Sequence, residues 1–178
     1  MRLYHTGGEI VKAPDIYRGR KNADFGQGFY LSPDREFARR WAGENAWINE
    51  YELDETGLSI LRLGRDREWF EYIFHNRRAE DTCRADVVLG PIANDTLFDS
   101  MGILSSGMIS GDIALRLLMI GPEYTQAAIK TERAARRLVW LGAERIERLD
   151  REARRAEQEE YQALFAREIR QMTGEDGI

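Results

Sequence analysis

Hydrophobic and polar positions along the chain follow two periods, and together they predict both strands and helices. Apolar and polar residues alternate over 46–53, which is the period of a half-buried strand. Residues 85–93 are apolar and rich in β-branched side chains, as in a central strand. Apolar residues recur at helical spacing after Ser32 and over 66–78. Weaker patterns predict strands over 2–6, 29–31, 58–63 and 125–130, a helical turn over 96–101 and a helix over 113–120.

The helix predictions rest on capping residues as well as on spacing. Ser32 is predicted to cap the first helix, because Pro33 fits the first helical position and acidic residues follow. Asp66 is predicted to cap the second. The last predicted helix begins at Thr131 and need not end before Gly174. Its first part is expected to place five apolar residues in the core: Ala134, Ala135, Leu138, Val139 and Leu141.

The composition changes after Gly142. Glu, Arg, Gln and Ala dominate the sequence from there on, and the apolar residues form only a narrow stripe at helical spacing. One helix cannot bury such a stripe alone, so it folds back on the domain or meets a partner helix. We therefore predict a domain over residues 1–142 and a helical tail over 143–178 that mediates self-association or partner binding.

The stretch around which the chain is organised is Phe25-Gly26-Gln27-Gly28-Phe29-Tyr30-Leu31-Ser32. Glycine permits positive φ and lets a ligand lie against the backbone without a Cβ in the way. A tight loop feeding an aromatic strand would suit a flat ring, such as nicotinamide or a nucleobase. The same pattern also fits a hairpin bend whose aromatic residues belong to the core, because short glycine motifs are not specific.

Composition and charge narrow the classes of function. The net charge of −5 argues against a broad nucleic-acid-binding surface. With Cys83 as the only cysteine and two histidines, the chain offers no disulfide and little for a metal site, so we expect no metal and a reducing compartment. The first residues lack the apolar stretch of a signal peptide, and no apolar run reaches the length of a membrane span. We expect a cytoplasmic protein of bacterial type.

Three candidate groups lie on predicted strands that are far apart in the sequence. His5 ends the first strand, Tyr30 follows the glycines, and Gln126 begins a late strand with Glu123 just before it. Neighbouring strands of one sheet could bring them into one cleft. His5 could equally be a structural hydrogen-bonding group, and Asn94 could either cap a helix or line a site at the end of its strand. The common hydrolase, zinc-protease and phosphate-loop motifs are absent from the sequence.

A resemblance to a known family rests on these same residues. Leu3-Tyr4-His5-Thr6-Gly7 and Asp24 to Ser32 resemble the first two motifs of ADP-ribosyltransferases of the His-Tyr-Glu class, which includes diphtheria-type toxins and poly-ADP-ribose polymerases. More closely, residues 2–141 resemble the bacterial DUF3990 family of predicted ADP-ribosyltransferase toxins. The matching segments further along are Trp41-Ala42, Asn76-Arg77, Asp86 to Asp95, and Gln126 before Lys130-Thr131. The resemblance implies an α+β fold with a split β-sheet core and flanking helices, to which the long C-terminal helix is added.

The resemblance also implies roles in binding NAD as co-substrate. His5 would bond the adenosine-side ribose, the backbone of Thr6 would pair with the nicotinamide amide, and Tyr30 would stack on the nicotinamide ring. Gln126 would replace the third-motif Glu and orient the nicotinamide ribose. The expected NAD-contacting residues are His5, Thr6, Gly7, Gly28, Phe29, Tyr30 and Asn94.

Two departures from the family pattern qualify this assignment. Thr6 stands where the family more often has Gly, and it would narrow the nicotinamide pocket. Gln126 cannot act as a general base, which fits transfer of a single ADP-ribose and disfavours chain elongation. Glu123 or Glu132 could supply a carboxylate instead.

The resulting expectation is a mono-ADP-ribosyltransferase that modifies a macromolecule, as the toxin of a toxin–antitoxin or interbacterial system. One alternative is an NAD glycohydrolase of the same fold. Another is a non-catalytic binding module that acts through its C-terminal helix, with an antitoxin or a second copy as partner.

Overall fold

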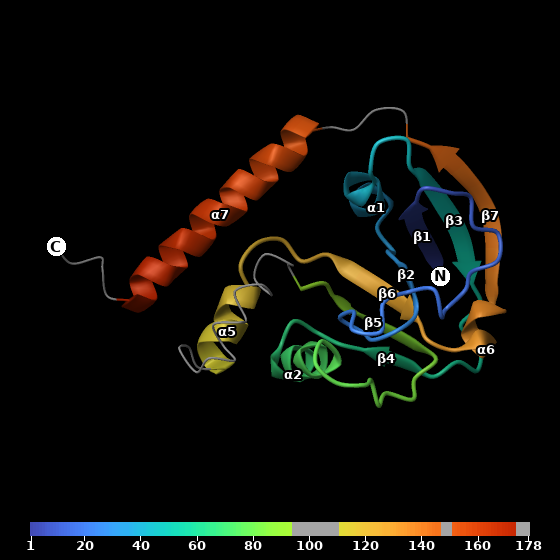
Figure 1. Ribbon diagram of the computed structural model, residues 1–178, viewed down its shortest axis with the longest axis horizontal. Helices are drawn as coiled ribbons and strands as arrows, with labels where there is room; N and C mark the ends of the chain where they lie inside the picture. Colours follow the sequence, from blue (N-terminus) through green and yellow to red (C-terminus); the bar gives the residue numbers. More distant parts are fainter. Residues whose placement is uncertain (94–110, 147–150, 174–178) are drawn as a thin grey trace. The chain divides into compact units, whose positions relative to one another are not determined.

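The computed structural model describes residues 1–93, 111–146 and 151–173 (Figure 1). Within them, helices are combined with two β-sheets, so the predicted α+β class is confirmed. The chain divides into two compact units, of which the first comprises residues 1–92 and 124–149 and the second residues 93–123 and 150–178. The helical turn predicted over 96–101 lies outside the described residues.

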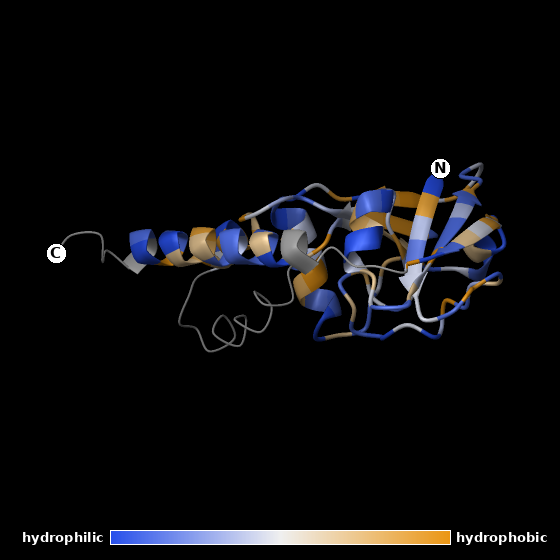
Figure 2. Cartoon of the chain, turned by 90° about the horizontal axis from the view of Figure 1, so that it is seen from above, coloured by the Kyte–Doolittle hydropathy of each residue, from blue (hydrophilic) through white to orange (hydrophobic). Residues whose placement is uncertain are grey.

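The first sheet is antiparallel, with the strand order β1-β3-β7. Its strands are β1 (Arg2–Gly7), β3 (Trp47–Leu53) and β7 (Leu138–Arg145). Strand β3 has the predicted alternation, because Tyr51 and Leu53 are fully buried while Glu50 and Glu52 on the other face bind Arg2. Figure 2 shows hydrophobic and hydrophilic residues alternating along these strands.

The second sheet has the order β2-β6-β5-β4. Its strands are β2 (Phe29–Leu31), β6 (Thr125–Ile129), β5 (Val87–Pro91) and β4 (Ile60–Arg62). Strand β5 pairs with β6 on one side and β4 on the other, and every residue in it is buried, as predicted for a central strand. The two sheets meet where Tyr4 and Ser32 exchange backbone N–H···O bonds, each 2.8 Å long.

One hydrophobic core unites the two sheets. Leu3 and Leu53 from the first sheet belong to the same cluster of buried side chains as Phe29, Leu89 and Ile129 from the second. Fully burying a side chain of this size contributes about 1.5–3 kcal/mol. This shared core fixes β1 and β2 relative to each other within the first unit, and β1 and β2 carry His5 and Tyr30.

The predicted caps of the two helices have different outcomes. The helices are α1 (Arg35–Trp41) and α2 (Arg67–Asn76). Asp66 caps α2 as predicted and accepts from the Trp69 N–H at 3.0 Å. For α1 the prediction of Ser32 is wrong, because Asp34 is the N-cap and accepts from two backbone N–H groups. Ser32 is still part of the strand arrangement, and its hydroxyl donates to the Thr125 carbonyl at 3.0 Å.

The continuous helix predicted from Thr131 is also wrong. Helix α6 (Glu132–Ala135) makes a single turn, and β7 follows it. Leu138 is buried at 8% exposure, whereas Val139 is 58% and Leu141 45% exposed. This is the two-residue period of a strand, so Leu138 is in the core while Val139 and Leu141 are not. Ala134 of α6 is fully buried, as expected.

The second unit contains α5 (Gly111–Leu118) and α7 (Arg151–Thr173). Arg116 of α5 forms an ion pair with Glu168 of α7. Tyr161 lies so close to Gly121 that a Cβ there would be 2.9 Å from its ring, and it stacks with Phe165 at 6.3 Å. These contacts pack one face of α7 within the unit. No helix in the described part of the chain is long and apolar enough to cross a membrane.

Candidate functional site

Residues 24–28, which we call the glycine loop, lead directly into β2. Gly26 has a φ of +72°, in the left-handed region that glycine adopts without strain. Gly28 serves close packing, because a Cβ there would lie 2.7 Å from the backbone carbonyl oxygen of Ile129. The side chain of Gln27 donates to the carbonyl groups of Tyr17 and Gly19, at 2.7 and 3.2 Å. The loop is therefore pressed between β6 and residues 17–19.

The Tyr30 hydroxyl closes this loop from inside. It accepts from the Phe25 N–H at 2.9 Å and donates to the Gly26 carbonyl at 2.7 Å. The Tyr30 ring lies nearly parallel to that of Phe25, with centroids 6.3 Å apart. Burial raises the pKa of the Tyr30 phenol above its ordinary value, although the bond from Phe25 acts in the opposite direction. The phenol is therefore neutral and positioned by two backbone bonds.

His5 is held against the strand that carries Tyr30. Its Nδ1 lies 2.7 Å from the Tyr30 carbonyl oxygen, and its ring contacts that of Phe29 with centroids 4.4 Å apart. A carbonyl oxygen only accepts, so Nδ1 carries the proton, and Nε2 of the neutral ring is an acceptor. Burial lowers the pKa of His5, and the bond to Tyr30 only partly offsets this. Nε2 is directed toward Gly7, where a Cβ would lie 3.2 Å from it.

Gln126 shares a face of the second sheet with Tyr30. Tyr30 pairs with Ala128, and Gln126 precedes Ala128 by two positions, so both side chains project to the same side. Such diagonal neighbours lie about 7–8 Å apart, within reach of long side chains. Gln126 is half-buried and sits opposite Gly90 of β5, where a Cβ would lie 3.1 Å from the Leu63 side chain and 3.2 Å from the Phe25 ring. The structure thus joins His5 to Tyr30 by a bond and Tyr30 to Gln126 by a common face.

The remaining residues expected to contact NAD have varied positions. Thr6 and Gly7 end β1 and are half-buried. Phe29 is buried in the hydrophobic core on the face opposite Tyr30, and its ring contacts that of His5. Asn94 lies outside the described residues. Of the two alternative carboxylates, Glu123 is exposed in the second unit, and Glu132 forms an ion pair with Arg136 at 2.6 Å.

A set of charged residues behind the glycine loop was not predicted as part of the site. Arg77 binds the Asp24 carboxylate, and the Asn76 amide donates to the Asp24 backbone carbonyl at 3.0 Å. Lys130 binds both Asp81 and the Phe25 carbonyl. Asn76 could have been found from the sequence, because it follows Ile73 by three positions on the buried face of α2. The Lys130 and Asp81 pair carries no local signal.

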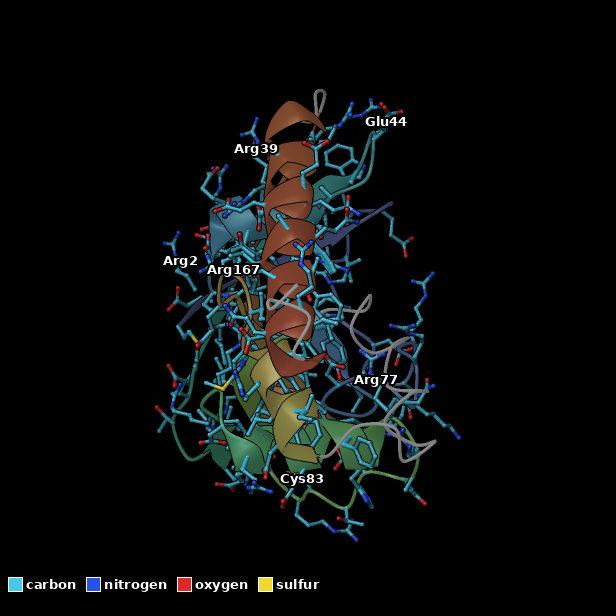
Figure 3. All side chains as sticks on the ribbon, turned by 90° about the vertical axis from the view of Figure 1, so that its left-hand side faces the viewer. Arg2, Arg39, Glu44, Arg77, Cys83 and Arg167 are labelled. Atoms are coloured by element: carbon cyan, nitrogen blue, oxygen red, sulfur yellow. The ribbon has the colours of Figure 1, made fainter. Side chains whose placement is uncertain are left out.

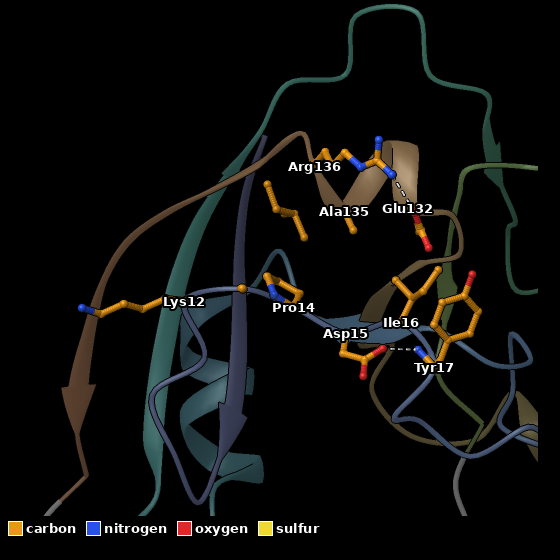
Figure 4. Close-up of a pocket in the computed structure, with 10 residues that line it drawn as sticks. Lys12, Pro14, Asp15, Ile16, Tyr17, Glu132, Ala135 and Arg136 are labelled. Atoms are coloured by element: carbon orange, nitrogen blue, oxygen red, sulfur yellow. Dashed lines mark hydrogen bonds and ion pairs between the residues drawn. The ribbon is translucent and has the colours of Figure 1, made fainter.

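A cleft of about 470 Å³ opens beside residues 12–17 (Figure 4). Its walls are residues 12–17 and the segment from α6 to Leu138. Lys12 and Arg136 are basic, Asp15 and Glu132 are acidic, and most of the other lining residues are apolar. His5, Tyr30 and Gln126 do not line it, so Glu132 is the one candidate residue that the cleft includes.

Comparison with known proteins gives a family but no activity. No curated protein matches the chain. The model of the family described as "Protein of unknown function (DUF3990)" matches residues 1–140, which include β1, the glycine loop, β2 and β6. That match spans most of the chain, and the chain belongs to the DUF3990 family.

Proposed function

We propose that the protein is a mono-ADP-ribosyltransferase that consumes NAD and modifies a macromolecule, and that it acts as a bacterial toxin. The observation that carries the proposal is the junction of His5 with Tyr30. Nδ1 of His5 is anchored on the Tyr30 carbonyl 2.7 Å away, so Nε2 of the neutral ring is held in place as an acceptor. An acceptor in fixed position suits a ribose hydroxyl, and the Tyr30 ring, which packs beside that of Phe25, suits a planar nicotinamide.

The chemistry needs positioning more than a strong base. The bond between the ribose C1′ and the nicotinamide nitrogen breaks, and its electron pair leaves with nicotinamide. The ribose becomes cationic, and an acceptor oxygen or nitrogen forms the new bond to C1′ and releases its proton to solvent. The side-chain dipole of Gln126, on the face of Tyr30, is suited to orient the nicotinamide ribose. An amide cannot take up a proton, which fits a single transfer to a reactive acceptor.

The test is to incubate purified protein with NAD labelled in its adenylate portion, with and without cell lysate. We expect labelled macromolecules and loss of NAD with the wild-type chain, and loss of both activities in Tyr30→Ala. Tyr30→Phe and Tyr17→Phe form a matched pair, because each removes one hydroxyl. Only the first removes the two bonds that close the glycine loop.

Three other results would each change the assignment. Free ADP-ribose without labelled product would make the protein an NAD glycohydrolase. Absence of NAD binding in calorimetry would leave a binding module, whose partner should then be lost when residues 143–178 are removed. Tyr30→Ala with full activity would refute the site itself.

A further inference from the structure

At Phe25 and Gly26 of the glycine loop, the N–H and the carbonyl of each residue are both hydrogen-bonded. The Phe25 N–H and the Gly26 carbonyl are both bonded to the Tyr30 hydroxyl, and the Gly26 N–H donates to the Ala23 carbonyl at 2.9 Å. The Phe25 carbonyl accepts from the Lys130 ammonium group. Buried backbone groups require partners, so the loop conformation and the position of the Tyr30 hydroxyl depend on each other and on Lys130.

Burying the charged Lys130 side chain beside the loop costs desolvation energy. Its side chain is 8% exposed, and that of its ion-pair partner Asp81 is 9% exposed. Asp81 also accepts from the Tyr72 hydroxyl, at 3.1 and 3.2 Å, and from the Cys83 N–H at 2.9 Å. A buried ion pair adds little net stability over a well-packed apolar pair, so stability alone does not explain its presence. What it does supply is a donor directed at one carbonyl of the loop.

A second cation holds the loop at its other end. Arg77 directs two N–H groups at one oxygen of Asp24, at 2.7 and 2.5 Å, and Figure 3 labels its side chain. Asn76, which precedes it, is fully buried and donates to the Asp24 backbone carbonyl. The end of α2 therefore fixes the start of the loop, and the residue after β6 fixes its middle.

We propose that Arg77 and Lys130 are positioning residues, which hold the glycine loop in the one conformation that presents Tyr30 to NAD. This inference rests on the proposed function. Neither cation needs to touch the dinucleotide. Lys130 binds the carbonyl of Phe25, whose N–H is bonded to the Tyr30 hydroxyl, and Arg77 binds Asp24, which directly precedes Phe25. Removing either clamp frees the loop to take other conformations, and NAD then binds only to the fraction of molecules with the loop in place.

Two variants and a control test the proposal. Arg77→Gln combined with Asp24→Asn removes one clamp without leaving the buried Asp24 carboxylate without its cation. Lys130→Met combined with Asp81→Asn removes the other without leaving a buried charge alone, whereas Lys130→Met by itself risks unfolding. Arg62→Gln is the control. Arg62 ends β4, on the opposite edge of the second sheet from β2, and forms an exposed ion pair with Glu55. Each variant is first shown to melt well above the assay temperature.

Two measurements then separate positioning from general stability. Calorimetry should show NAD binding weakened at least about tenfold in both variants and unchanged in the control, as expected when a binding group is misplaced. At saturating NAD, the rate of NAD consumption should fall much less than the affinity does. Hydrogen exchange of the Phe25 and Gly26 amides should be faster by at least about tenfold in the variants, because those amides are protected only while the loop is closed.

The outcomes of these measurements are distinguishable. Folded variants that bind NAD as tightly as wild type would overturn the inference, as would weakened binding with unchanged exchange at Phe25 and Gly26. If the wild-type chain does not bind NAD, the proposed function fails. The exchange measurement would then still decide whether Arg77 and Lys130 hold the loop.

Discussion

At the scale of single residues, His5 has a defined tautomer and a lowered pKa. Its Nδ1 proton is engaged by the Tyr30 carbonyl, and burial disfavours the doubly protonated ring. As the pH falls, the imidazole of His5 therefore takes up its second proton in the unfolded chain before it does so in the folded chain. The stability that neutral His5 provides is complete above its ordinary pKa of 6.5, and it is lost as the pH falls toward the lower folded value.

This predicts a pH dependence that belongs to His5. Between pH 7.5 and 5.5, the free energy of unfolding should decrease more in wild type than in His5→Gln, which keeps a donor but does not titrate. Urea denaturation at several pH values measures both curves. Parallel curves for the two proteins would show that another group governs the acid sensitivity.

Residues with a local role could be predicted from the sequence, and residues with a distant partner could not. The glycines of the loop and the aromatic Tyr30 predict a tight turn before a strand, and the structure has both. The partnership of Lys130 with Asp81 spans 49 residues, and nothing in either neighbourhood indicates it. Two charges that far apart pair only because β6 and the segment after α2 meet in the folded chain.

At the scale of elements, the start of α1 shows how tertiary contacts redirect a capping signal. Ser32 has the composition of an N-cap, but its hydroxyl and backbone tie β2 to β6 and β1. Asp34 provides the cap instead, and it bonds the N–H groups of Glu36 and Phe37 at 2.9 and 3.0 Å. The two side chains therefore stabilise different parts of the molecule.

We predict that Asp34→Ala lowers the free energy of unfolding by about 0.5–2 kcal/mol, the usual cost of losing a cap. Glu36→Ala, an exposed acidic position in the same turn, serves as the control and should cost much less. Urea denaturation followed by circular dichroism measures both. Equal losses would mean that the charge of the first turn, and not the cap itself, stabilises α1.

Strand β7 illustrates the limit of period-based prediction. Leu138 to Leu141 is a continuous apolar run, and such a run fits a buried helix face as well as a strand. Pairing with β3 makes this segment a strand, because it satisfies the backbone hydrogen-bonding groups of β7 along the first sheet. That pairing joins segments far apart in the chain, which no short window of sequence contains.

At the scale of the whole molecule, the α+β class was predictable because strand and helix periods both occur along the chain. The division into two units was not, because it depends on contacts between distant segments. The first unit is interrupted after residue 92 and resumes at 124, and α5 in the inserted part packs on α7. The second unit is thus built from two separate stretches of chain.

A chain that ends at residue 149 should therefore lose more than α7. We expect its first unit to melt within about 2 °C of the same transition in the full chain, since the core of that unit is complete without the tail. Helix α5 should lose the contacts of Arg116 and Gly121 with α7 and become sensitive to proteases. Calorimetry and limited proteolysis measure the two effects, and a lowered transition of the first unit would contradict the division.

The late position of Lys130 has a consequence for synthesis on the ribosome. It follows Phe25, whose carbonyl it binds, by 105 residues, and β2 is bonded to β6 just before it. A nascent chain emerges with its N-terminus first, so the glycine loop cannot be completed until that distant lysine has left the exit tunnel. If the protein consumes NAD as proposed, chains that terminate before Lys130 are inert, and the cell that makes the protein meets its activity only after that residue has been added.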